Sequence, residues 1–469
     1  MTQGNPSVEM ESRPAKPHPG EKKLAWILAM VVAGFFASLI FHYELGVVLH
    51  MPYPLNTFLF RPHAQFTDFY DNFRVAKTTF AKDASDRVLT PGWGSTVLML
   101  RAWLLYRICD PANVPPEART LHAIVAASPF LAWGISEMFF LFAVFYFVRG
   151  TILEVSPDCL WAKILALTLC SYPVLFCLDR SNFETTVFVL LAASIFLYGK
   201  GRFLWSALLL GVVVAVKPYG VVFLALFLGD RKFKEIAISL GTAVLLTLGA
   251  LLLLPGEASE NLAMLRDSMA VYTTLYVQGN EGLYFGSSLY GLAKVWIYST
   301  HFLLRGADAA AIAAFMRRFM SIYFLFAVAF FAAVAVLLCG FRMAFWKKIA
   351  LLVCCMNMLP YICGDYRLIH LFIPMLLFLC EKQTEEGDKI FCALFGLLLI
   401  PKGFMHLVFD PVFAINPYEV SEGVVFNPLL MLALVLLIAF SVLRRPFASD
   451  TATWLLGFAG RSRGLEAPR

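Results

Sequence analysis

Two carboxylates three residues apart, Asp68 and Asp71, lie in the stretch Phe66-Thr-Asp-Phe-Tyr-Asp71, which follows the first long apolar run of the chain. A carboxylate within hydrogen-bond reach of a hydroxyl can act as its general base. An acidic pair just outside an apolar run faces water at a lipid boundary. The pair therefore suits the activation of a hydroxyl beside a lipid-borne substrate.

Two cations continue this series at the same interval. Arg74 and Lys77 follow Asp68 and Asp71 every three residues, so in a helix the four charges form one polar stripe. The stripe would direct carboxylates toward a cavity and hold cations close behind. The same spacing also suits an ordinary helix surface with i,i+3 ion pairs, and spacing alone leaves both interpretations open.

Three further groups of polar and ionisable residues interrupt apolar sequence. They are Asp179-Arg180 with Asn182 and Glu184, Lys217, and Asp365-Tyr366-Arg367 followed by His370. A charged residue in hydrocarbon costs about 2.5–3.5 kcal/mol on insertion scales, so such residues indicate a function or a pairing. An ion pair with the neighbouring aspartate in the turn would explain why Arg180 is there. Lys217 would be explained if its long side chain extended to a lipid phosphate. A shared site is the alternative, with the acids supplying a base and the cations binding an anion.

The composition defines the class of protein that carries these residues. Of 469 residues 60% are hydrophobic and only 15% are charged, and the mean hydropathy is +0.73, which indicates a polytopic membrane protein. The net charge of +6 is explained by the expected cytoplasmic loops, so no nucleic-acid partner is expected. The ten cysteines show no zinc spacing, and no GxxxxGK[ST] loop is present, so nucleotide hydrolysis is not expected.

Apolar runs near the roughly 20 residues that cross a bilayer predict about ten transmembrane helices. They are expected at 24–41, 123–148, 161–178, 183–199, 235–254, 318–340, 348–363, 366–380, 389–409 and 425–443. Residues 1–22 and 446–469 are expected to be cytoplasmic tails, the first of them disordered, on either side of one integral-membrane domain at 23–445.

The lysines and arginines between the expected spans set the orientation. Basic clusters at both ends of residues 203–228 place those ends on the cytoplasmic face. Two full crossings need about 40 residues, so the segment is predicted to form a re-entrant hairpin that bends near Lys217-Pro-Tyr-Gly220. Segments 42–122 and 255–317 then lie outside, and their aromatic residues predict interfacial helices.

The order of these features resembles the GT-C class of integral-membrane glycosyltransferases, and within it the bacterial polyprenyl-phosphate-mannose-dependent mannosyltransferases. The residues that carry the resemblance are Phe66-Thr-Asp-Phe-Tyr70, the run from Asn182 to Lys217-Pro-Tyr-Gly220, and Asp230-Arg-Lys232. The resemblance spans roughly residues 24–380. It implies a GT-C-like helical bundle at the bacterial inner membrane, with an active site that faces the periplasm or exterior.

The resemblance also implies a catalytic aspartate in the first outer loop, which Asp68 matches. The expected reaction is inverting transfer of a hexosyl unit, with mannose the expected sugar, from a polyprenyl-phosphate donor to a glycan or lipid acceptor. Asp71 departs from the family pattern, in which a tyrosine pair follows the aspartate, and it leaves open which carboxylate is the base. The expected donor-phosphate ligands are Lys217, Arg180 and Arg367, and the expected substrate-orienting residues are Tyr70, Asn182 and Asp365.

No cofactor or metal is required by this chemistry, although a divalent ion that bridges the two aspartates to the phosphate stays open. The bilayer is the remaining expected partner. A secondary transporter or lipid-linked oligosaccharide flippase is the main alternative function, because charges also line transport pathways. A membrane polymerase or ligase of surface glycans is a third alternative, and it would not need the early acidic motif.

Overall fold

The computed structural model describes a large part of the chain, and the fold and the site are built from these residues alone. They are residues 19–41, 43–44, 48, 68, 160–180, 182–254, 256–279, 286–298, 309–381, 385, 387–402, 404–406 and 419–444. The span expected at 123–148, the C-terminal tail and most of the N-terminal tail fall outside them.

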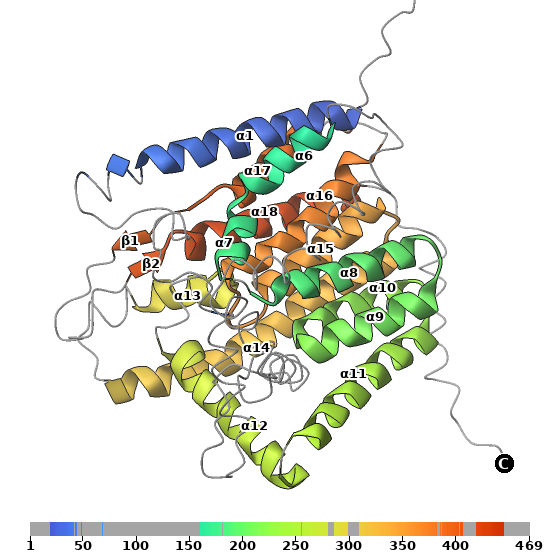
Figure 1. Ribbon diagram of the computed structural model, residues 1–469, viewed down its shortest axis with the longest axis vertical. Coiled ribbons are helices and arrows are strands. Elements are labelled where there is room, and N and C mark those ends of the chain that lie inside the picture. The colour runs from blue at the N-terminus through green and yellow to red at the C-terminus, as the bar shows by residue number, and fades with distance from the viewer. Residues whose placement is uncertain are drawn as a thin grey trace, which may run out of the picture.

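The described residues are overwhelmingly helical (Figure 1). Four of their helices are long and apolar enough to cross a membrane, and they coincide with four expected spans. These helices are α1 (Pro19–Phe41), α11 (Phe233–Leu253), α14 (Ala309–Gly340) and α18 (Gly423–Leu443). The prediction of an all-α membrane protein is confirmed, while the number of crossings stays a prediction. The described residues also contain one small antiparallel pair, β1 (Phe404–His406) with β2 (Glu419–Ser421).

Helix α15 (Phe345–Met358) runs through the centre of the bundle. Residues 349–356 are completely buried, because α16, α18 and the helical turn η10 cover the helix on several sides. The neighbouring elements are η10 (Asp365–Leu371), α16 (Phe372–Leu379) and α17 (Asp388–Leu399). Helix α1 lies along α17 at one edge of the bundle, and α11 forms the opposite edge (Figure 1).

The segment between the basic clusters folds back on itself. Its elements are α8 (Glu184–Gly199), α9 (Phe203–Val216), η6 (Pro218–Phe223) and α10 (Leu224–Gly229). Helix α9 advances about 21 Å, and the chain then returns. The Tyr198 hydroxyl donates to the Leu226 carbonyl at 3.0 Å, and the Lys232 ammonium lies 4.5 Å from the Phe203 ring centre. The start and the end of the hairpin therefore lie together, as the sequence predicts for a re-entrant segment.

Other basic residues gather at this same end of the bundle. The rings of Tyr198 and Phe345 stack at 6.0 Å, which joins the end of α8 to the start of α15. Nearby, Lys347 binds Glu385 at 2.6 Å, and Lys23 binds Asp388 at 3.0 Å. Helix α8 is antiparallel to both α9 and α15. The residues singled out as chemical candidates therefore lie at the end of the bundle opposite these basic residues.

Several expected spans differ from the helices that form. The span expected at 348–363 is helical only as far as Met358, and the span expected at 366–380 is divided between η10 and α16. Prolines explain two further differences. The span expected at 161–178 is divided into α6 (Leu160–Leu169) and α7 (Tyr172–Arg180), with Pro173 in the first turn of α7, where a missing N–H is tolerated. The span expected at 389–409 ends as a helix at Leu399. Ile400 is extended because Pro401 follows it, and a residue before proline is disfavoured in the helical region.

The outer segment expected at 255–317 is helical in its described parts. It contains α12 (Ala258–Tyr272), the π-helical turn η7 (Thr273–Gln278) and α13 (Leu289–Ile297), and α14 begins within it. Asn261 anchors α12 by donating to the Leu251 and Leu254 carbonyls at the end of α11. Leu262, Met269 and Val271 are exposed apolar residues of α12. Exposed apolar side chains are expected of a helix that lies in the membrane interface.

Candidate active site

Asp68 is held by two residues more than a hundred positions away in the sequence. Arg180 Nε and Nη2 donate to Asp68 Oδ1 at 3.1 and 2.7 Å, and Asn182 Nδ2 donates to Asp68 Oδ2. Both oxygens of the carboxylate are thus engaged by donors at the junction of α7 and α8. The guanidinium and the carboxamide therefore fix the orientation of the Asp68 carboxylate.

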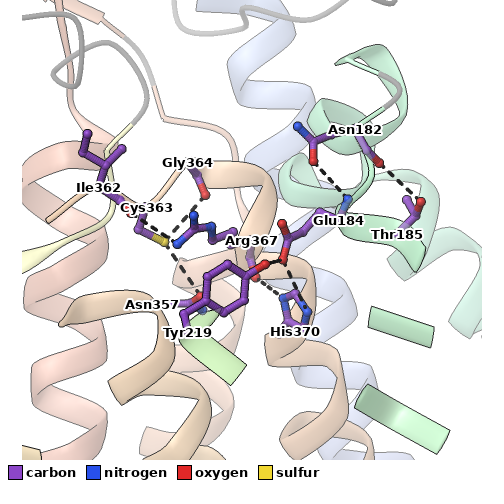
Figure 2. Close-up of polar contacts among 10 residues, drawn as sticks. All are labelled: Asn182, Glu184, Thr185, Tyr219, Asn357, Ile362, Cys363, Gly364, Arg367 and His370. Carbon is purple, nitrogen blue, oxygen red and sulfur yellow. Dashed lines mark hydrogen bonds and ion pairs between the residues drawn. The ribbon is translucent and has the colours of Figure 1, made fainter. Parts of the chain in front are cut away.

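Asn182 has a second role in the backbone at this junction. Its Oδ1 accepts the N–H of Glu184 at 2.9 Å, and its carbonyl accepts the Thr185 hydroxyl at 3.3 Å (Figure 2). Asparagine is among the preferred residues for binding a free N–H at the start of a helix. The residue that contacts Asp68 is therefore fixed by the first turn of α8.

Glu184 lies at the start of α8 and is completely buried, with a relative exposure of 0%. Its Oε1 accepts the Tyr219 hydroxyl and lies 3.6 Å from His370 Nε2 (Figure 2). Among the described residues its Oε2 has no hydrogen-bond partner. A buried carboxylate without full hydrogen bonding is unfavourable unless cations lie nearby.

Those cations come from the bend of the hairpin and from η10. Pro218 ends α9, and the preceding Lys217 is extended, which directs the chain into η6. The Lys217 ammonium interacts electrostatically with Glu184, Arg367 and Asp68. The guanidinium of Arg367 stacks on the Tyr219 ring with its centre 4.1 Å from the ring centroid.

Backbone contacts fix the position of Arg367. Its Nη1 donates to the Ile362 carbonyl at 3.2 Å, and its own carbonyl lies 2.8 Å from His370 Nδ1. The Nε–H has no hydrogen-bond partner among the described residues. Arg367 therefore retains a buried donor that an anion could accept.

Basic side chains outnumber acidic ones among the described members of this group. The acids are Asp68 and Glu184, and the basic residues are Arg180, Lys217 and Arg367, with His370 beside Glu184. Asp68 is paired with Arg180. A group in which basic side chains predominate suits an anionic ligand such as a phosphate.

Asp365 belongs to a separate polar network. Its Oδ1 accepts the Ser287 hydroxyl and the Asn427 side-chain N–H, the latter at 3.1 Å, and Lys402 interacts with it electrostatically. Burial raises the pKa of Asp365, and these donors and the Lys402 charge oppose that rise. Lys402 also donates to carbonyls at the end of α17, including Leu397 at 2.7 Å.

Five of the predicted site residues thus come together, namely Asp68, Arg180, Asn182, Lys217 and Arg367. Asp365 makes its hydrogen bonds in the neighbouring network, while Asp71 and Tyr70 lie outside the described residues. Arg180 pairs with Asp68, while the side chain of Asp179, the other member of the turn pair considered from sequence, lies outside the described residues.

Three residues of the group were missing from the predicted site: Glu184, Tyr219 and His370. Their positions beside Asn182, Lys217 and Arg367 in the sequence were the available signal. Their mutual contacts join α8, η6 and η10, and no spacing pattern within one segment reveals such contacts.

A metal site does not stand out in the part of the chain that the structure describes. No group of three or more His, Cys, Asp or Glu side chains is arranged there to hold a metal ion. The clustered carboxylates are instead bound by guanidinium, carboxamide and phenol donors.

An all-α membrane protein with acids and cations gathered at one end of its bundle has the parts that a GT-C-like membrane glycosyltransferase needs. Residues 114–343 match the family model of glycosyltransferase family 87. The match confirms the resemblance to such enzymes and supports glycosyltransferase activity. The matched segment contains Arg180, Asn182, Glu184, Lys217 and Tyr219. No curated protein matches the chain.

Proposed function

We propose that the chain transfers a hexosyl unit, with mannose the expected sugar, from a polyprenyl-phosphate carrier to a hydroxyl of a glycan or lipid acceptor. The observation that carries the proposal is the Asp68 carboxylate held by Arg180 and Asn182 beside the cations Lys217 and Arg367. A base and an anion site next to each other are what glycosyl transfer from a phosphate requires.

In this scheme Asp68 is the general base. The acceptor hydroxyl attacks the anomeric carbon from the face opposite the phosphate, which inverts the configuration, and Asp68 takes the hydroxyl proton. Arg180 and Asn182 hold the carboxylate in a fixed orientation. Asp71 is assigned to orienting the base or the acceptor.

The departing phosphate gains negative charge as the glycosidic bond breaks. Fixed cations stabilise this charge more in the transition state than in the ground state, which is the condition for catalysis. Lys217 and Arg367 are assigned to this role, and Arg180 contributes while paired with Asp68. A phosphate leaving group needs no proton from a strong acid.

Tyr70, Asn182 and Asp365 are assigned to orienting the substrate, Asp365 from the neighbouring polar network. The scheme requires no metal. The alternative is a divalent ion that bridges Asp68 and Asp71 to the phosphate, and in that case a metal chelator would abolish transfer. The proposed location is the plasma membrane of a bacterium, with the site on the periplasmic or exterior face and the carrier lipid supplied from the bilayer.

Purified protein in lipid vesicles, supplied with polyprenyl-phosphate mannose labelled in the sugar and with candidate glycan acceptors, tests the proposal. We expect labelled product that depends on both donor and acceptor and persists in the presence of a metal chelator. Transfer from a nucleotide sugar alone would contradict the lipid-linked donor. Passage of the intact labelled donor across the bilayer, without transfer, would favour the transporter alternative.

A further inference from the structure

Glu184 places a negative charge inside a site that is otherwise suited to binding an anion. The carboxylate is 0% exposed, accepts the Tyr219 hydroxyl and interacts electrostatically with Lys217 and Arg367. Since Asp68 is paired with Arg180, Glu184 is the described acid that offsets the other two cations. A phosphate bound by Lys217 and Arg367 would therefore feel repulsion from Glu184.

The strength of this repulsion depends on the charge of the phosphate. A sugar-linked polyprenyl phosphate is a phosphodiester with one negative charge. The released polyprenyl phosphate is a monoester, and such a group carries about −1.5 to −2 at neutral pH. A fixed neighbouring charge therefore acts more strongly on the product than on the donor.

We propose that Glu184 is a positioning residue that weakens the hold of Lys217 and Arg367 on the released polyprenyl phosphate and so speeds its departure. The inference rests on the proposed function, because it requires a lipid-phosphate leaving group. Glu184 acts through the two cations and the Tyr219 ring on which Arg367 stacks.

The reaction step creates the charge that Glu184 opposes. The acceptor oxygen forms a bond to the anomeric carbon, and the bond from that carbon to the phosphate oxygen breaks. The phosphate leaves with the electron pair of the broken bond, and the acceptor proton passes to Asp68. The anion site then holds a monoester whose greater charge strengthens its binding to the cations.

Glu184→Gln tests the inference because glutamine keeps the size and the acceptor oxygen for Tyr219 but removes the charge. The measured quantities are kcat, the KM for the donor, and the inhibition constant of a prenyl monophosphate added as product. We expect the inhibition constant to fall about fivefold or more, a smaller fall in the donor KM, and a lower kcat.

Glu260→Gln is the matched control, since it removes the same charge at an exposed position on α12 and should leave the inhibition constant unchanged. Glu184→Asp is a second test in case the glutamine variant does not fold, because it keeps the charge and should keep the inhibition constant within about twofold of the wild type. Tyr219→Phe removes the hydrogen bond but not the charge, and it should not tighten product binding.

The outcomes separate this inference from the proposed function. A wild type that transfers sugar from the lipid phosphate, with unchanged or weaker product inhibition in Glu184→Gln, would overturn the inference and leave the function standing. Equal tightening in Glu184→Asp would overturn it as well, since charge would then not be the cause. A wild type that neither uses the lipid-phosphate donor nor binds the monophosphate would refute both.

Discussion

Asn182 joins the two carboxylates of the site through one side chain. Its amide nitrogen donates to Asp68, and its amide oxygen accepts the Glu184 N–H at 2.9 Å. The two contacts need a donor and an acceptor held apart, and the carboxamide of asparagine supplies both. We infer that the position of the base and the start of α8 are coupled through Asn182.

Asn182→Asp separates these two contacts. Aspartate still accepts the Glu184 N–H, so we expect the free energy of unfolding to stay within about 1 kcal/mol of the wild type. The donor that holds Asp68 Oδ2 is replaced by an acceptor of like charge, so the base loses its fixed orientation and kcat should fall about tenfold or more. Thermal unfolding and initial transfer rates check the two expectations. An unchanged kcat would remove Asn182 from the proposed machinery.

The chemical residues that sequence predicted share one property: each is charged or polar within or beside an apolar run. Lys217 and Arg367 were found for this reason, since a charge there has few structural explanations. Glu184 lies in a polar turn and Tyr219 in a bend, where such residues are ordinary. Their roles depend on the contact between η6 and α8 in the folded protein. No pattern within either segment predicts that contact.

At the scale of the elements, long uninterrupted apolar runs predicted helices well. The positions at which a helix breaks within an apolar run were harder to predict. The spans near α1, α11, α14 and α18 formed as expected. The hairpin bend at Lys217-Pro218 was predicted because a charge and a proline coincide there. Pro173 and Pro401 are comparable helix-breaking residues. Pro173 lies in the first turn of α7, where its missing N–H is tolerated, and Pro401 disfavours a helical conformation of the residue before it, which ends α17.

The hairpin that carries Lys217 requires a close approach at Gly220. A Cβ added there would lie 2.6 Å from Cγ1 of Val213, a buried β-branched residue with little freedom to move. Gly220→Ala should therefore separate α9 from η6, lower the free energy of unfolding by about 1–3 kcal/mol, and raise the donor KM by displacing Lys217. Unfolding experiments and donor titrations measure the two effects.

Gly241→Ala is the matched control for this prediction. An added Cβ at Gly241, in α11, meets no atom within 4 Å. We expect stability equal to the wild type or up to about 1 kcal/mol greater, because alanine favours the helix, and an unchanged donor KM. Equal effects of the two substitutions would show that the close contact at Gly220 does not position Lys217.

At the scale of the whole molecule, the charges divide between the two ends of the bundle. Lys23, Lys347 and Lys232 lie at the end where the hairpin begins and finishes. The proposed site lies at the other end. This division agrees with a cytoplasmic basic end and an outer catalytic end, which the positive-inside rule predicts.

Single cysteines on a cysteine-free background test this arrangement. Lys200→Cys and Arg231→Cys should react with a membrane-impermeant maleimide from the same face, because the hairpin brings its ends together. Asp267→Cys on the exposed side of α12 should react from the opposite face. Labelling of positions 200 and 231 from opposite faces would contradict the re-entrant hairpin.

The central claim, that Asp68 is the base of a lipid-phosphate glycosyltransferase, is tested most directly by Asp68→Asn. Asparagine retains the size of the side chain and loses its basicity, so transfer of labelled sugar from the polyprenyl-phosphate donor should fall about 10²–10⁴-fold. The protein should still insert and fold. Asp267→Asn, an exposed acid on α12, should transfer sugar at the wild-type rate. Sugar transfer by Asp68→Asn at a rate near the wild type would contradict the account.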